Sequence, residues 1–372
     1  MASTTRDDIA HDLLARDPEE LLPPLRRGQG LLPVSVDDVA LLDADHAIAI
    51  AVLTDGRGIF VPCMRDARGW RRAQPGDGMA GALLNAPPPL NVTRFRAIDI
   101  GPADSESGIA VDMTNDIVVI SDRVVLKWQL FATPGSLAGP TLVAHLDAAG
   151  FADMPPPLAQ VTWGENSLAA LTGFLDGAED GWTWLVDEAA TFAQGGAEQV
   201  TWPEQLGRVV ARLHACAATR TQIIPDPVHD DSPLTDFADH YRYLLDRLPA
   251  LENSVHDRIN PWLARFTESI DRLARTRAMA LPIHGDLHAG QILRWSGGLA
   301  VSDFDGNPIM PSTNDVARGP SAYDIACLLR SIDHASVVAR VKRLTSETTQ
   351  ERAREWSREN RARVLEIGRA HV

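Results

Sequence analysis

One short stretch, residues 282–305, constrains the fold of this chain more than any other. It begins as a glycine-containing loop, Pro-Ile-His-Gly-Asp-Leu-His-Ala-Gly-Gln, and ends in Ser-Asp-Phe-Asp. Two apolar runs, 292–295 and 299–301, lie between these ends and flank a Gly-Gly turn, which predicts a β-hairpin. Such a hairpin would bring Asp286, before the first strand, close to Asp303, after the second. The sequence therefore predicts a rigid unit with carboxylates at neighbouring ends.

Three polar side chains of this stretch have the chemistry that phosphoryl transfer requires. A carboxylate on a rigid loop, Asp286, can orient an acceptor hydroxyl and take its proton. Gln291 and Asp303 offer hard oxygen ligands of the kind that hold Mg²⁺ together with nucleotide phosphates. Each residue taken alone is also compatible with a turn or an exposed side chain. Their combination predicts a catalytic base followed by two metal ligands.

Lysine is nearly absent from the chain, which makes its two lysines informative. Only Lys127 and Lys342 occur, and every other strong base is arginine. A Walker A loop requires Gly-Lys-Ser/Thr, but Leu126 and Val341 precede the lysines, so this class of nucleotide site is excluded. Lys127 lies in the apolar strand-like run 124–128, where a charge is costly unless it is paired. We predict that Lys127 contacts ATP phosphates; a solvent-facing strand lysine is the alternative.

Other polar residues are predicted to support this unit. Asp324 lies in the apolar segment 321–330, which is typical of a buried helix, and a buried carboxylate must accept hydrogen bonds. The backbone amides of the 282–291 loop are candidate donors, with an exposed helix position as the alternative. His284 and His288 have the spacing of a metal pair on a helix, but the loop is interrupted by glycines. We interpret His284 as structural support and keep His288 as a candidate substrate contact.

Composition excludes several functional classes. The 372 residues include 35 basic and 50 acidic side chains, and the resulting charge of −15 disfavours nucleic-acid binding, which needs a basic surface. The three cysteines are far apart and lack metal-ligand spacing, which favours reduced thiols in a cytoplasmic protein. The N-terminus has no signal core, and no apolar run is long enough to span a bilayer. We expect a monomer or weak dimer without nucleic-acid or membrane partners.

Strand-like and helical signals divide the chain into three parts. Residues 1–110 contain paired apolar runs around a central Asp-Gly turn and predict a β-rich N-terminal cap. Residues 111–180 contain a second hairpin and one helix, and they lead into an acidic turn at 176–182 that is a candidate hinge. Residues 181–372 show mainly the 3.6-residue period of helices. The predicted fold class is therefore α+β.

Further helices are expected within the third part. The segments 236–248 and 259–278 have helical patterns, and the alternating Glu and Arg of 345–365 predict a solvent-exposed helix face. The last seven residues, Glu-Ile-Gly-Arg-Ala-His-Val, match the translation of a common sequencing adapter. We therefore expect the natural chain to continue beyond Val372.

These motifs resemble those of the aminoglycoside phosphotransferase-like kinases over about residues 115–340. The family pattern His-Gly-Asp-x-x-x-x-Asn is matched by 284–291, with Gln291 where many members have asparagine. The run Asp-Phe-Asp at 303–305 is similar to the metal site of the family. Within it, Gly-Asp-Leu-His-Ala-Gly-Gln-Ile-Leu at 285–293 is similar to maltokinases, and the longer Asp-Phe-Asp-Gly-Asn-Pro is similar to bacterial glucosamine kinases.

The resemblance implies a bilobal protein-kinase-like fold. Lys127 would lie on the sheet of a β-rich N-lobe, and Asp286, Gln291 and Asp303 would lie on a mainly helical C-lobe, with MgATP between the lobes. Asp305 would bind metal or meet the ammonium group of a substrate.

The chain departs from the family in two respects. The helix after the lysine strand usually carries a glutamate that pairs with the lysine, but 142–149 has none, and Asp147 is its nearest carboxylate. In place of a glycine-rich phosphate loop the chain has Met-Thr-Asn-Asp at 113–116, whose backbone amides are candidate phosphate ligands.

The function implied is an ATP- and Mg²⁺-dependent kinase of a small-molecule sugar or amino sugar. Glucosamine, phosphorylated at its 6-hydroxyl, is the favoured acceptor. Maltokinase, which forms maltose 1-phosphate, and aminoglycoside phosphotransferase are alternatives within the class. A non-catalytic nucleotide-binding pseudokinase is the alternative from another class.

Overall fold

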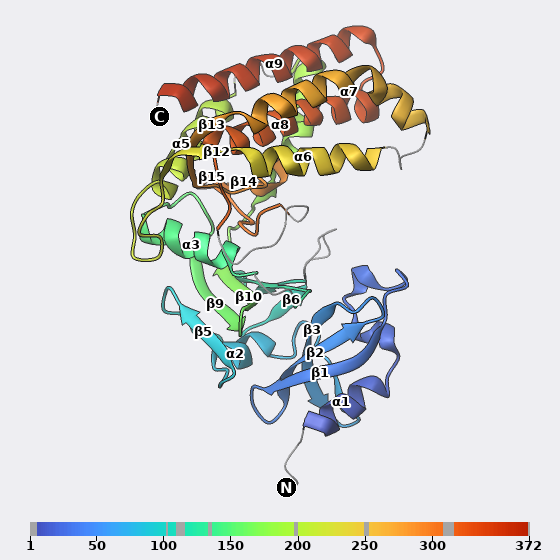
Figure 1. Cartoon of the computed structure of the whole chain (residues 1–372). Coiled ribbons are helices and arrows are strands. Elements are labelled where there is room, and N and C mark those ends of the chain that lie inside the picture. Colours follow the sequence, from blue (N-terminus) through green and yellow to red (C-terminus); the bar gives the residue numbers. More distant parts are fainter. Residues whose placement is uncertain are drawn as a thin grey trace.

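The computed structural model has three parts that follow one another along the molecule (Figure 1): a cap at the N-terminal end, a sheet-containing N-lobe and a helical C-lobe. It describes residues 6–101, 103–108, 116–132, 136–196, 200–248, 253–307 and 316–370. The predicted α+β arrangement, β-rich first and helical afterwards, is confirmed.

The cap is a four-stranded antiparallel sheet covered by a short helix. Its elements are α1 (Arg6–Leu14), two 3₁₀ turns (Pro18–Leu21 and Pro24–Arg26), β1 (Pro33–Leu41), β2 (His46–Leu53), β3 (Gly58–Asp66) and β4 (Gly69–Arg72). Ile9 and Leu13, four residues apart on α1, are buried against the sheet together with Trp70. The predicted hairpin around the Asp-Gly turn is confirmed as β2–β3.

The N-lobe is a six-stranded antiparallel sheet in the order β5-β9-β10-β8-β7-β6. Its elements are α2 (Met79–Leu84), β5 (Leu90–Arg94), β6 (Glu106–Gly108), β7 (Ile117–Ile120), β8 (Val124–Trp128), α3 (Ala138–Ala148), β9 (Pro157–Trp163) and β10 (Asn166–Gly173). The predicted hairpin that carries Lys127 is confirmed as β7–β8. Its turn residues Ser121 and Asp122 both have positive φ, as the two central residues of a type I′ turn require, and the amide of Arg123 closes this turn by donating to the carbonyl of Ile120 at 3.0 Å.

Two strands that lie within residues 1–110 join the N-lobe sheet. β5 pairs with β9, and β6 pairs with β7. We therefore propose that the boundary between cap and N-lobe lies between β4, which ends at Arg72, and α2, which contacts β9. Strand β3 of the cap forms backbone hydrogen bonds with the segment that follows β8. The amide of Phe60 donates to the carbonyl of Leu130 at 2.9 Å, and the amide of Ala132 donates to the carbonyl of Gly58 at 3.0 Å.

The C-lobe is built on four helices that pack together and two small sheets. The helices are α4 (Gly181–Ala193), α5 (Trp202–Ala217), α8 (Ser321–Arg343) and α9 (Glu347–Ala370), with α6 (Thr235–Arg247) and α7 (Asn253–Ala274) as an outer pair. The sheets are β11 (Glu179–Asp180), β14 (Ile292–Trp295) and β15 (Gly298–Val301), and β12 (His229–Pro233), β13 (Arg277–Pro282) and β16 (Arg318–Gly319). None of the helices in the described ranges combines the length and apolar character that crossing a bilayer requires.

Two helix predictions for this lobe need correction. The predicted helix 259–278 begins earlier, at Asn253, and ends at Ala274, because Arg277 and Ala278 pair with β12 instead. The helix predicted to be solvent-exposed, 345–365, has a buried face. Its apolar residues are few, but Ala353, Trp356 and Val364 share one side of α9 and pack into the core.

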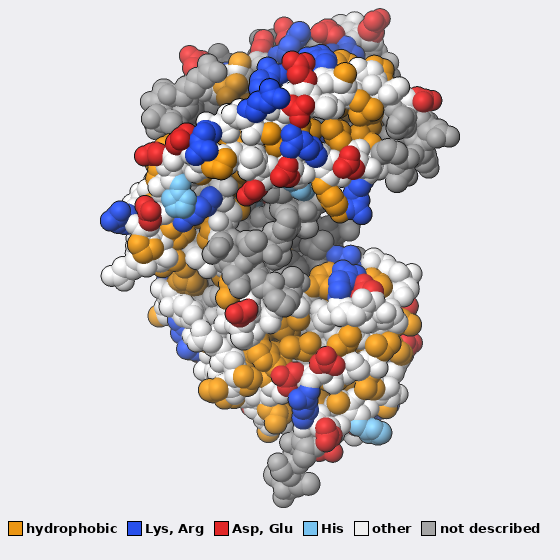
Figure 2. All heavy atoms as spheres, viewed as in Figure 1, with side chains coloured by type: hydrophobic (Ala, Val, Ile, Leu, Met, Phe, Trp, Pro, Cys, Tyr) orange, Lys and Arg blue, Asp and Glu red, His pale blue; other side chains and the backbone are white. Residues whose placement is uncertain are grey.

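Four large hydrophobic side chains are exposed on the outer pair of helices: Tyr241, Tyr243, Trp262 and Phe266. Figure 2 shows acidic and basic side chains interspersed over the helical lobe and hydrophobic ones gathered over α6 and α7. Trp262 and Phe266, one turn apart on α7, are 51% and 46% exposed.

Candidate active site

The predicted loop and hairpin form a single unit at the centre of the C-lobe. Strand β13 ends at Pro282, a loop follows, and a 3₁₀ turn (Ala289–Gln291) leads into β14. Ile292 pairs with Val301 at the open end of the hairpin, which confirms the predicted hairpin, and its two-residue turn is Ser296–Gly297 because Gly298 already pairs with Trp295. Ser302 donates to the backbone carbonyl of Gln291 at 2.8 Å. The segment that carries Asp303 is thereby fixed beside the end of the loop that carries Asp286.

Asp324 fastens this loop to helix α8. Its side chain is fully buried, and its two carboxylate oxygens accept from the backbone amides of His284 and Gly285, both at 2.9 Å. Burial alone would raise the pKa of Asp324, but the hydrogen bonds from His214 at 3.1 Å and from the backbone amide of His284 outweigh burial and lower it. Gly285 has φ +80°, a conformation that glycine adopts readily. The loop is therefore held by a glycine turn and a buried acceptor.

His284 links the loop to the segment after the hairpin. Its Nδ1 accepts from the backbone amide of Asp286 at 3.3 Å, and its Nε2 lies 3.0 Å from the carbonyl of Ser302. A neutral imidazole has one donor and one acceptor nitrogen, so Nε2 donates to Ser302. The ring is 2% exposed and packs 5.0 Å from the ring of Phe304. These contacts connect the loop that carries Asp286, the predicted base, to the segment that carries Asp303, a predicted metal ligand.

Asp286 lies at the rim of this buried unit. Its side chain is 27% exposed, and one carboxylate oxygen lies 3.8 Å from Nε2 of His288. Burial raises the pKa of Asp286 above its ordinary value, and the charges of Asp303 and Asp324 add to the rise. A carboxylate whose pKa is raised is a stronger base than an exposed one.

Lys127 reaches across from the N-lobe to the segment after the hairpin. Its Nζ lies 2.6 Å from Oδ1 of Asp303 and 2.6 Å from Oδ2 of Asp305. Gln129 donates to the same Oδ2 of Asp305 at 2.8 Å. Burial lowers the pKa of Lys127, but the charges of Asp305 and Asp303 outweigh burial and raise it overall. Lys127 is thus a paired lysine rather than a solvent-facing one.

Backbone geometry sets Asp303 apart. Its φ is +61°, a left-handed conformation that residues other than glycine adopt at a cost of roughly 1–3 kcal/mol. Such conformations cluster where a side chain must point in one direction. Here the conformation brings Asp303 to Lys127 at the junction of the two lobes.

His288 and Gln291 are in contact within the 3₁₀ turn. Nδ1 of His288 accepts from the backbone amide of Gly290 at 3.0 Å, so the ring proton lies on Nε2. The side-chain nitrogen of Gln291 lies 3.3 Å from Nε2 of His288, so the nitrogen and not the oxygen of the amide faces the ring. The amide oxygen therefore stays available for another ligand. His288 is therefore placed to orient the Gln291 amide.

The two departures from the family pattern have structural counterparts. Asp147, on α3, pairs with Arg96 at 2.6 Å and not with Lys127. Of the predicted phosphate-binding turn, 113–115 lie outside the described residues, and Asp116 forms an ion pair with Arg72 of the cap.

Several residues of the site were not identified from the sequence. Gln129 follows Lys127 by two positions, so strand alternation could have indicated that both face the same side. Gly139, at the start of α3, lies against Asp305, and Ser331 accepts from the backbone amide of Ala289 at 2.8 Å. For Gly139 and Ser331 the sequence carries no local signal, because their partners are distant along the chain.

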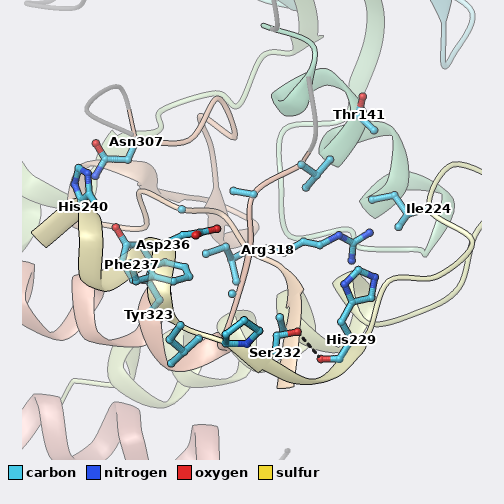
Figure 3. Close-up of a pocket in the computed structure, with 18 of the residues that line it drawn as sticks. Thr141, Ile224, His229, Ser232, Asp236, Phe237, His240, Asn307, Arg318 and Tyr323 are labelled. Atoms are coloured by element: carbon cyan, nitrogen blue, oxygen red, sulfur yellow. Dashed lines mark hydrogen bonds between the residues drawn. The ribbon is translucent and has the colours of Figure 1, made fainter. Parts of the chain in front are cut away.

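A large pocket opens beside the loop (Figure 3). Its volume is about 1510 Å³, and Gly285 and Tyr323 belong to its lining. Helix α6 contributes acidic and aromatic side chains, among them Asp236, Asp239 and Phe237. A pocket with carboxylates and aromatic faces is suited to a polar ligand that carries positive charge.

Comparisons with known proteins agree with this geometry. A model described as the phosphotransferase enzyme family matches residues 141–357. Glucosamine kinase of Streptacidiphilus jiangxiensis is 35% identical over 349 residues, which cover 87% of this chain and 78% of that protein. Glucosamine kinase of Mycolicibacterium smegmatis is 33% identical over 308 residues, which cover 77% of this chain and 75% of that protein.

A solved structure is similar over nearly the whole chain. It is described as glucosamine kinase in complex with glucosamine, ADP and inorganic phosphate, and it is 28% identical to this chain with a TM-score of 0.74. The match covers 97% of this chain and 87% of that chain. The predicted kinase-like fold is thereby confirmed.

Proposed function

The chain belongs to the phosphotransferase enzyme family, and we propose that it is a glucosamine kinase that transfers the γ-phosphoryl group of ATP to the 6-hydroxyl of the sugar. The observation that carries this proposal is the arrangement of Asp286 and Asp303 around one hairpin, in a chain 35% identical to a glucosamine kinase. As a member of this family, the protein uses a nucleotide as its phosphoryl donor.

Asp286 is proposed as the residue that orients the acceptor hydroxyl and takes its proton. It lies on a loop that Asp324 and His284 hold from the buried side, so its position is fixed before the substrate arrives. Burial raises its pKa, which strengthens it as a base. Most of the rate enhancement in phosphoryl transfer comes from such positioning and from charge stabilisation.

The donor set fits Mg²⁺. Gln291 and Asp303 supply an amide and a carboxylate oxygen, and no group of three or more His, Cys, Asp or Glu suited to a metal exists among the residues that the structure describes. Mg²⁺ is commonly held by one or two protein groups, phosphates and water. We infer that these two side chains hold it and that His288 orients Gln291. When bound, the ion would neutralise charge on the phosphates.

Lys127 is proposed to contact the nucleotide phosphates. Its Nζ lies beside the predicted metal ligand Asp303, so phosphates bound to the metal would come within its reach. Lysine is a compact point charge suited to phosphate oxygens.

The acceptor is proposed to bind in the pocket beside Gly285. Its acidic and aromatic lining, with Asp236, Asp239 and Phe237 from α6, suits the ammonium group and the apolar ring face of an amino sugar. Asp305 and His288 stay candidate acceptor contacts from the sequence prediction. The predicted monomer or weak dimer and cytoplasmic location also stay predictions.

A coupled ADP-release assay tests the proposed function. Glucosamine, maltose and an aminoglycoside are compared as acceptors, with N-acetylglucosamine as the uncharged control. We expect the highest kcat/KM with glucosamine and a phosphate at its 6-position by ³¹P NMR. Turnover of maltose or the aminoglycoside but not glucosamine would contradict the proposal. ADP binding without turnover of any acceptor would favour a non-catalytic nucleotide-binding protein.

Metal removal tests the proposed ligands. EDTA should abolish turnover, and added Mg²⁺ should restore it. Asp303→Asn should require roughly ten- to hundredfold more Mg²⁺ for half-maximal rate, because the metal loses a negatively charged oxygen ligand. Equal Mg²⁺ requirements for the variant and the wild-type enzyme would exclude Asp303 as a metal ligand.

A further inference from the structure

Lys127 is paired with two carboxylates of one short segment. Asp303 and Asp305 both lie 2.6 Å from its Nζ. If Asp303 binds the metal in the nucleotide complex, as proposed above, it has less negative charge to offer the lysine. A second carboxylate is then needed to keep the buried ammonium group in place, because an unpaired charge at an 18% exposed site is costly.

We propose that Asp305 is the positioning residue that orients Lys127 toward the nucleotide, in place of a carboxylate on helix α3. This inference rests on the proposed function. It assigns Asp305 to the nucleotide side of the site and not to the acceptor.

Two side chains from one strand face converge on Asp305. Lys127 and Gln129 are two positions apart, and both donate to its Oδ2, at 2.6 and 2.8 Å. The backbone amide of Gln129 donates to Leu168 at 2.9 Å, so the residue is anchored on the N-lobe sheet. A carboxylate oxygen that accepts from both an ammonium and an amide group has a fixed direction. Asp305 is therefore held by the N-lobe sheet through Gln129 while it pairs with Lys127.

The start of α3 fits tightly against the same residue. A Cβ atom on Gly139 would lie 2.6 Å from Oδ1 of Asp305, 3.0 Å from its Cα and 3.0 Å from the carbonyl oxygen of Phe304. Two of these three neighbours are backbone atoms, which cannot rotate away. Only glycine lets the helix approach so closely. The helix that would carry the pairing carboxylate in related kinases here contacts the Asp305 segment with its backbone.

No carboxylate on α3 can replace Asp305. The only acidic residue within Ala138–Ala148 is Asp147, and its Oδ1 is 2.6 Å from Arg96. As a result, the orientation of Lys127 depends on the segment that also carries Asp303. The same segment then positions both Lys127 and the proposed metal ligand Asp303, and no side chain of α3 takes part.

The scarcity of lysine makes the pairing directly measurable. Lys127 and the exposed Lys342 are the only lysines, so a limiting amine-acylating reagent gives two lysine peptides that mass spectrometry separates. In Asp305→Asn, without nucleotide and in EDTA, we expect acylation of Lys127 relative to Lys342 to be at least about fivefold faster than in the wild type, because a charged partner is lost. Asp147→Asn is the matched control and should leave this ratio unchanged.

Nucleotide affinity gives an independent readout. Asp305→Asn should raise the Kd for ADP, measured by calorimetry, and the KM for ATP by roughly 10- to 100-fold, with the KM for glucosamine changed less than threefold. Gly139→Ala, which keeps every charge, should raise the same two constants by displacing Asp305. It also serves as the second variant if Asp305→Asn does not fold.

The outcomes separate this inference from the proposed function. A KM increase for the amino sugar alone, with unchanged Lys127 reactivity and ADP affinity, would place Asp305 in the acceptor site and overturn the inference. Unchanged values in both Asp305→Asn and Gly139→Ala would also overturn it. If the wild-type protein phosphorylates no sugar, the proposed function fails, whereas Lys127 acylation and ADP binding still decide the role of Asp305.

Discussion

Replacing Asp324 tests how the loop that carries Asp286 is held in place. Asp324 is fully buried, and it accepts two backbone hydrogen bonds, from His284 and Gly285, both at 2.9 Å. Asp324→Ala removes both acceptors and leaves two buried amides without a partner. Asp324→Asn keeps the shape and one acceptor oxygen, but it turns an NH₂ group toward the second amide.

The expected magnitude follows from these contacts. A hydrogen bond to a charged group contributes about 1.5–3 kcal/mol, so the alanine variant should lose roughly 3–6 kcal/mol of local loop stability. Each 1.4 kcal/mol corresponds to about tenfold in an equilibrium. We expect kcat to fall by at least about 100-fold in Asp324→Ala and by about 10-fold or more in Asp324→Asn. The KM for ATP should change little, because Lys127 is held elsewhere.

The assay is ADP release at saturating ATP, with circular dichroism to establish that each variant is folded. Asp333→Asn is the matched control, since Asp333 lies on the same helix but is 56% exposed, accepts from Ser357 at 3.0 Å and forms an ion pair with Arg361 at 3.8 Å. Its kcat should stay within about twofold of wild type, as for most surface substitutions. A folded Asp324→Ala protein with wild-type kcat would refute the view that Asp324 holds the loop.

Two further predictions concern Asp286 and the cap. Burial raises the pKa of Asp286, so the acid limb of kcat/KM should lie above the ordinary aspartate pKa of about 3.9; a limb at or below that value would contradict the assignment. Asp286→Asn should abolish turnover, because the proposed base is lost. Since the ionised carboxylate destabilises the fold above about pH 3.9, the variant should also melt at a higher temperature than the wild type at neutral pH, and this increase in melting temperature should vanish below about pH 4. Arg72, which is 6% exposed, binds Asp116 and the carbonyl of Leu21. Arg72→Met should cost roughly 3–5 kcal/mol in urea unfolding, as expected for breaking a buried pair, and a loss below about 1 kcal/mol would show that the contact is dispensable.

The sequence was most informative where the determining contacts are local. The β14–β15 hairpin follows from two apolar runs on either side of a glycine-containing turn, because its strands are neighbours in the chain. The apolar stripe of α5, from Leu206 to Ala217, likewise specifies a helix with one buried face. These local patterns already placed Asp286 and Asp303 at one end of a hairpin.

Predictions were less accurate where burial depends on packing between distant elements. The charged segment that forms α9 looked solvent-exposed, yet Trp356 is buried against Trp202, whose ring lies 5.9 Å away. Nothing local in the sequence indicates which sheet the strands β5 and β6 join. β5 and β6 are the two edge strands of the N-lobe sheet. The partner of an edge strand depends on where the tertiary structure places it, and its own sequence does not specify that partner.

The sequence by itself determined that this chain carries a base, an amide and a carboxylate on one compact unit, because all three lie within 18 residues of chain, Asp286 to Asp303. Only the tertiary structure decided how Lys127 is held. Its partners Asp303 and Asp305 lie 176 and 178 positions away, and Asp147, the nearest carboxylate on the helix after the lysine strand, pairs with Arg96 instead. Ion pairs of this kind form wherever folding brings opposite charges into a shared low-dielectric site, and sequence separation carries no information about that distance.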